Sequence, residues 1–163
     1  MPAKAIFQNS SQQLLFEKQG FLVLENFLNN DEVKHMDELF DQLHPNLPES
    51  GFYAGSYSND FAYKKQVSEE IKQVYHRAYE ERFKDYTPFG GAYLFKMPSL
   101  DSDLFIHQDW TVVDESKDIA LNIWVPLCDI TIENGPLMVL PGSHYDNLPT
   151  LRAPTMRYFF DQD

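Results

Sequence analysis

The sequence is poor in cysteine, in basic residues and in long apolar runs, and each shortage excludes something. A single cysteine, Cys128, rules out an intramolecular disulfide and makes a reducing cytoplasm the expected setting. With 13 basic against 25 acidic residues the net charge is -12, which disfavours binding to nucleic acid or anionic membranes. No apolar run approaches the ~18 residues of a membrane span, and the N-terminus lacks a signal-peptide core. We therefore expect a soluble, intracellular protein.

Aromatic residues, in contrast, are abundant. The chain has 13 Phe and 9 Tyr, which supply much of the volume of an apolar core. A length of 163 residues predicts one domain, large enough to bury about two-thirds of the surface that its unfolded chain exposes.

The first part of that domain, residues 1–90, is predicted to be mainly helical. Apolar residues at three- and four-residue spacing predict a helix over 31–43, capped by Asn30, and another over 68–83, capped by Ser68. A shorter helix is expected over 10–19, stopped by Gly20, and is followed by a short strand at 21–25. Residues 44–63 hold many turn formers, so we expect a long loop that packs on the surface or forms a lid.

From residue 91 the apolar period changes from helical to extended. Strands are predicted over 92–97, 104–113, 119–127 and 137–140, with a turn at Asn134-Gly135 before the last one. Within 119–127, alternate residues such as Leu121 and Ile123 would face the core, and the residues between them would face the other way. Helices first and antiparallel-looking strands afterwards predict an α+β fold.

His107 and Asp109 form the candidate metal site. On a strand, side chains two residues apart point to the same face, so this imidazole and this carboxylate would lie side by side. The pair makes two-thirds of the facial triad of two histidines and one carboxylate that holds non-haem Fe(II). A His-x-Asp pair also occurs by chance, and a histidine hydrogen-bonded to a near neighbour is the alternative.

The residues that follow make a more specific pattern. After His107-Gln-Asp109 come a Trp-bearing segment, Ile119-Ala-Leu-Asn-Ile-Trp-Val-Pro-Leu127, then Asn134-Gly135, then Leu140-Pro-Gly-Ser-His144. In this order and spacing, the motifs resemble the phytanoyl-CoA dioxygenase family. Residues 19–28, Gln-Gly-Phe-Leu-Val-Leu-Glu-Asn-Phe-Leu, resemble the opening strand of the family, so the resemblance covers most of 11–144.

The resemblance implies a fold and an activity. The fold would be N-terminal helices packed on a cupin-like double-stranded β-helix, or jelly roll, with residues 91–144 as its strands. The activity would be that of an Fe(II)- and 2-oxoglutarate-dependent dioxygenase, which uses O2 to hydroxylate an unactivated carbon of a small-molecule substrate and releases succinate and CO2.

The resemblance also implies roles for individual residues. His107 and Asp109 would ligate the iron as neutral imidazole and carboxylate. Trp124 matches a family residue that packs against 2-oxoglutarate. By position and not by resemblance, Asn122 and Lys96 are also candidate cofactor-binding residues. Asn122 shares the face of Trp124, and Lys96 can reach a co-substrate carboxylate, with an ordinary surface lysine as the default alternative. Cys128 has no ligand-spaced neighbour and is expected to be structural.

The sequence departs from the family at its C-terminal end. The second His ligand of the family, and the Arg that binds 2-oxoglutarate, lie several tens of residues beyond the Pro-Gly-Ser-His segment. Only nineteen residues follow His144, and none of them is His; Arg152 and Arg157 do not fit the pattern. We therefore expect a jelly roll that is incomplete over residues 145–163.

Four interpretations of this departure stay open. The chain can be the N-terminal part of a longer dioxygenase. A second chain, or a second copy in a homo-oligomer, can complete the barrel and supply the third ligand. His144 can turn inward and complete a rearranged triad. Lastly, the domain can be non-catalytic and serve as a binding module.

Overall fold

The computed structural model describes residues 4–109, 113–114 and 117–145. Outside the described residues lies Trp110. So does almost all of the predicted segment 145–163, namely residues 146–163, which include Arg152 and Arg157. The elements follow in the order α1 (Ser10–Gln19), α2 (Asn30–Leu43), β1 (Phe52–Ala54), α3 (Phe61–Arg82) and β2 (Leu94–Lys96). Short 3-10 turns lie at Gly55–Tyr57, Leu100–Ser102, Ile132–Asn134 and Ser143–Tyr145.

Helix α1 has the predicted bounds, and both of its ends are capped. At its start, the Asn9 side chain accepts hydrogen bonds from the backbone N–H groups of Ser11 and Gln12. At its end, Gly20 adopts a left-handed conformation with φ 81°, and its N–H binds the carbonyl of Phe16. Glycine adopts this conformation without the steric penalty of a Cβ, which explains why the helix stops there.

Helix α2 begins one residue earlier than predicted, because Asn29 and not Asn30 is its cap. The Asn29 side chain binds the N–H of Glu32, and the Glu32 carboxylate binds the N–H of Asn29, which forms a capping box. The predicted apolar stripe is present: Met36 is buried, and Val33 and Phe40 pack against the core.

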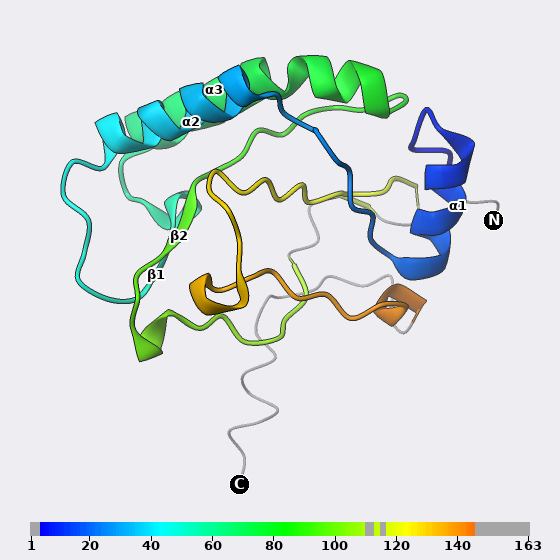
Figure 1. Cartoon of the computed structure of the whole chain (residues 1–163). Helices are drawn as coiled ribbons and strands as arrows, with labels where there is room; N and C mark the ends of the chain where they lie inside the picture. Colours follow the sequence, from blue (N-terminus) through cyan, green and yellow to red (C-terminus); the bar gives the residue numbers. More distant parts are fainter. Residues whose placement is uncertain (1–3, 110–112, 115–116, 146–163) are drawn as a thin grey trace, which may run out of the picture.

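Helix α3 begins seven residues before the predicted start. Its cap is Asp60, whose side chain accepts from the N–H of Tyr63, so Ser68 lies inside the helix. The predicted inward face is confirmed for Ile71, Tyr75 and Ala78, which are buried. Figure 1 shows α2 and α3 lying alongside each other across one side of the molecule.

The buried core lies beneath these two helices. Among the described residues, all buried hydrophobic side chains fall between Phe7 and Tyr93 in the sequence. The N-terminal segment closes one end of the core, because Phe7 pairs with Phe83 in an isolated β-bridge just after α3. None of the described helices is both long and apolar enough to span a membrane.

The only sheet in the described part of the chain has two strands. β1 and β2 are antiparallel, with Phe52 opposite Lys96 and Ala54 opposite Leu94. The predicted strand over 92–97 is confirmed in its central part. The predicted long loop over 44–63 is wrong in part, since it contains β1, a 3-10 turn and the start of α3. Strand β1 forms because it is hydrogen-bonded to β2, some forty residues further along the chain. The sequence around β1 does not reveal this pairing.

The predicted jelly roll is not observed among the described residues. Residues 21–25, the described parts of 104–113, and residues 119–127 and 137–140 form no strands there. A strand is defined by its hydrogen-bonded partner, and these segments lack a ladder within the described chain. The predicted alternation is nevertheless present from Leu121 onward, since Leu121, Ile123, Val125 and Leu127 pack against the core. It is wrong at the start of the segment, where Ile119 is exposed.

The end of the described chain docks on α1. The N–H of Gly142 binds the carbonyl of Gln19 at 2.8 Å. His144 Nε2 and the Tyr145 hydroxyl both bind the carbonyl of Glu17, at 2.9 and 2.7 Å. The last carbonyls of a helix have no partner within it, and residues 142–145 supply partners for those of Glu17 and Gln19.

Candidate functional site

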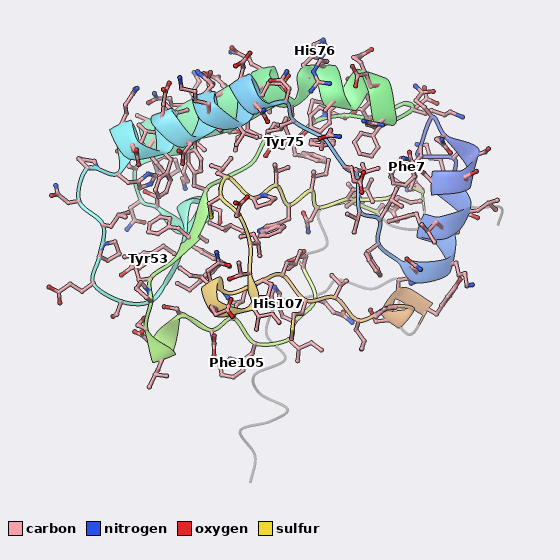
Figure 2. The ribbon with its side chains drawn as sticks, in the orientation of Figure 1. Phe7, Tyr53, Tyr75, His76, Phe105 and His107 are labelled. Carbon is pink, nitrogen blue, oxygen red and sulfur yellow. The ribbon has the colours of Figure 1, made fainter. Side chains whose placement is uncertain are left out.

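His107 is held by the backbone of its own segment. Its Nδ1 lies 2.7 Å from the carbonyl oxygen of Phe105, which can only accept a hydrogen bond. Nδ1 therefore carries the proton, and in the neutral imidazole the lone pair is on Nε2. Figure 2 shows His107 and Phe105 on the side of the molecule opposite α2 and α3.

Asp109 lies beside that lone pair, as its spacing from His107 predicts. Its Oδ1 is 3.5 Å from His107 Nε2, and the side chains are 59% and 28% exposed, respectively. Metal–ligand bonds to imidazole nitrogen and carboxylate oxygen are about 2.0–2.2 Å long, so two such donors at this separation can reach one ion. The prediction that these two side chains lie together is confirmed by the geometry, although the segment is not part of a ladder.

Asn122 joins this pair from a different segment. Its Nδ2 donates a 2.5 Å hydrogen bond to Asp109 Oδ2, the oxygen that does not face His107. Asn122 is exposed, and its neighbours Leu121 and Ile123 turn toward the core. The predicted alternation of faces thus places Asn122 at the site, but its contact with Asp109 has no signal in the sequence.

Trp124 and Lys96 do not share in the hydrogen bonds of this cluster among the described side chains. Trp124 is on the same outward side of its segment as Asn122 and is 42% exposed. The stem of Lys96 lies over Gly135, so that Lys96 contacts the Asn134-Gly135 turn. The predicted roles of both residues in binding the co-substrate stay predictions.

The donor chemistry at this site fits a divalent metal only in part. His107 and Asp109 offer one nitrogen and one oxygen donor, in a set that suits Fe(II). Among the described residues, no group of three or more His, Cys, Asp or Glu side chains is arranged to hold a metal ion. A third His, Cys, Asp or Glu donor is therefore absent from the site in the part of the chain that the structure describes.

His144 is not that third donor. Its Nε2 is bound to the carbonyl of Glu17 on α1, and its Nδ1 lies close to Gly20. The interpretation that His144 turns into the metal site is therefore wrong for this structure. Cys128, expected to be structural, is exposed.

The other histidines are structural or exposed. His44 stacks on Phe40, with ring centres 4.4 Å apart, and its Nε2 lies 3.1 Å from the Tyr63 hydroxyl. His35 pairs with Glu70 across α2 and α3 at 2.6 Å. His76 lies on the outer side of α3 (Figure 2).

Comparison with known proteins identifies relatives but no structural template. The chain is 26% identical to a phytanoyl-CoA dioxygenase of Arabidopsis thaliana over 180 residues, covering 82% of this chain and 64% of the relative. It is 25% identical to phytanoyl-CoA dioxygenase 1 of Oryza sativa subsp. japonica over 183 residues, covering 84% and 65%. It also matches phytanoyl-CoA dioxygenase domain-containing protein 1 of Danio rerio, at 37% identity over 57 residues, covering 34% and 20%. No solved structure matches.

The chain spans a little under two-thirds of the two plant proteins. Both plant alignments are longer than the chain itself, so the relatives have residues inside the matched region that have no counterpart here. The family model described as phytanoyl-CoA dioxygenase matches residues 16–163, which include His107, Asp109 and Asn122. This match covers nearly the whole sequence, and the chain therefore belongs to the phytanoyl-CoA dioxygenase family.

Proposed function

We propose that this chain belongs to an Fe(II)- and 2-oxoglutarate-dependent oxygenase that hydroxylates a small-molecule substrate. The observation that carries the proposal is the pairing of His107 Nε2 with Asp109 Oδ1 at 3.5 Å, in a chain of this family. A nitrogen lone pair and a carboxylate oxygen are two of the three protein donors in the facial triad of such enzymes.

The residues of the site would divide the work as follows. The Phe105 carbonyl holds the imidazole of His107 in the tautomer whose Nε2 binds metal. The negative charge of Asp109 offsets part of the charge of the ion. When bound, iron with 2-oxoglutarate and O2 supplies the oxidation of a substrate C–H bond to C–OH, while 2-oxoglutarate is converted to succinate and CO2. Trp124 is exposed on the outward side of its segment, where an aromatic face is available for packing against the co-substrate.

An anaerobic titration tests this proposal. The purified chain is titrated with Fe(II) and 2-oxoglutarate while the visible charge-transfer band of the chelate is followed. We expect a saturable band at one iron per site, lost in His107→Ala and kept in His76→Ala, which alters an exposed histidine on α3. A folded chain that gives no band at any iron concentration contradicts the proposal for this chain.

A second candidate function is that of a non-catalytic binding module, which is an interaction domain and not an enzyme. It is favoured by the lack of a three-donor group among the described residues. Formation of succinate from 2-oxoglutarate separates the two functions. Turnover that depends on His107 supports the oxygenase, whereas 2-oxoglutarate or another small molecule bound without turnover supports the module.

A further inference from the structure

Asn122 lies on a segment that the core holds in place. Leu121 and Ile123, its direct neighbours, and Val125 pack against the buried cluster beneath α2 and α3. Their packing fixes the segment, and alternation along an extended chain then turns Asn122 outward. Its amide group is thereby presented to Asp109 from a segment thirteen residues away.

The hydrogen bond from Asn122 makes the two oxygens of the Asp109 carboxylate unequal. Oδ2 accepts the Nδ2–H of Asn122 at 2.5 Å, and Oδ1 faces His107 Nε2 at 3.5 Å. The carboxylate is therefore held between an amide donor on one side and the imidazole on the other. Asp109 is 59% exposed and would otherwise rotate in solvent.

His107 has the corresponding support from the Phe105 carbonyl. In His107, Nε2 thus faces Asp109 while the Phe105 carbonyl fixes Nδ1. In Asp109, Oδ1 faces His107 while Asn122 fixes Oδ2. Such outer partners orient metal ligands, and their loss typically costs 10–100-fold in metal affinity. If these hydrogen bonds only stabilised the fold, His107 Nε2 and Asp109 Oδ1 would not need to face each other.

We propose that Asn122 is a positioning residue, which holds Asp109 Oδ2 so that Oδ1 alone is directed to a divalent metal shared with His107. This inference rests on the proposed function and gives Asn122 a role different from the contact with the co-substrate that its position on the Trp124 face suggests. It predicts an effect on metal binding alone, before 2-oxoglutarate or substrate is added.

The test measures Mn(II) binding from the loss of the free-ion EPR signal, without co-substrate. Asn122→Leu keeps the approximate size of the side chain but removes the donor, and Asn46→Leu is the matched control in the exposed loop after α2. We expect Asn122→Leu to weaken Mn(II) binding by at least about 10-fold, with the metal-free melting temperature equal to that of the control. In an Asp109→Ala background, Asn122→Leu should cause no further loss, because its partner is gone.

A second readout needs no metal. The side-chain amide resonances of Asn122 should shift in Asp109→Ala, while those of Asn46 stay in place. Unshifted Asn122 resonances overturn the inference, as does Asn122→Leu with the wild-type affinity for Mn(II). A wild-type chain that binds no Mn(II) overturns the proposed function together with this role, so the two failures are distinguishable.

Discussion

At the scale of single residues, Gly20 is held by two independent constraints. Its φ of 81° is in the left-handed region, and a Cβ added there would overlap the imidazole of His144. Gly142 has the same φ, but an added Cβ would meet nothing within 4 Å. A substitution at Gly142 therefore measures the loss of stability from the left-handed backbone alone. The same substitution at Gly20 adds the loss from the steric clash with His144.

We expect Gly142→Ala to lower the free energy of unfolding by about 1–2 kcal/mol, the cost of a left-handed L-residue. Gly20→Ala should cost more, because the His144 ring must also move away from the Glu17 carbonyl. Urea denaturation measures the backbone and the steric contributions to this loss. It is carried out on the single variants and on the double variant Gly20→Ala with His144→Ala. If His144→Ala does not reduce the cost of Gly20→Ala to that of Gly142→Ala, the docking of His144 on α1 is contradicted.

Residue-scale prediction from sequence succeeded where spacing alone determines geometry. His107 and Asp109 are two positions apart, and their side chains lie together although no strand forms at these described residues. The bond between Asn122 and Asp109 is different, because it depends on how two separate segments are placed. The alternation of 119–127 predicts which way Asn122 points, but not what it meets there.

At the scale of elements, Glu32 and Arg77 tie the start of α2 to α3. Glu32 Oε2 lies 2.6 Å from Arg77 Nη2, and Oε1 lies 2.9 Å from Nε, which makes a two-point contact. Glu32 also accepts the N–H of Asn29 in the capping box. The hydrogen bonds from Arg77, and then that from Asn29, hold the pKa of the Glu32 carboxyl below its usual value, against the opposing effect of burial.

This shift makes part of the stability depend on pH. A carboxyl whose pKa is lower in the folded state stabilises the fold above its unfolded pKa of about 4.5, and this contribution is lost as the pH falls through the folded pKa. We expect Glu32→Gln to have a lower urea midpoint than the wild type at pH 7, and the gap to narrow as the pH falls below about 4.5. Glu38→Gln is the control, since Glu38 forms only an exposed pair with Lys34 at 3.6 Å. A gap that persists unchanged at pH 3 contradicts the assignment.

A helix or strand could be predicted from the sequence where its own residues and their close neighbours decide its conformation. Helix α1 and the body of α2 are encoded within their own residues, by caps and a recurring apolar stripe, and both were predicted. The early start of α3 was missed because turn formers continue up to Asp60, which is itself the cap. Strand β1 was missed because its determinant is β2, a distant segment.

At the scale of the whole molecule, the chain is packed unevenly. Buried hydrophobic side chains among the described residues lie between Phe7 and Tyr93, whereas residues 100–145 hold many exposed apolar ones. We call these exposed side chains the distal apolar set; it comprises Leu100, Leu104, Phe105, Ile106, Ile119, Trp124, Ile132, Leu137, Met138, Val139, Leu140 and Tyr145. The candidate site therefore lies in the less packed part of the described chain.

Exposed apolar surface of this extent binds apolar probes and promotes association. We expect the chain to enhance the fluorescence of an apolar dye, and Met138→Lys, at a side chain 84% exposed, to reduce that enhancement while the melting temperature stays unchanged. Val23→Lys is the control, because Val23 is 77% exposed but lies outside the distal apolar set. Equal dye binding by the wild type and both variants would show that this set is covered in solution.

The docking of residues 142–145 on α1 also bears on how the chain is made. Glu17 and His144 are 127 positions apart, so at about 5–20 residues per second a ribosome needs roughly 6 to 25 s to synthesise the partner after the helix. During that interval the last carbonyls of α1 are left to water. A nascent chain that stalls before residue 142 therefore leaves the carbonyls of Glu17 and Gln19 without the partners that the finished chain provides.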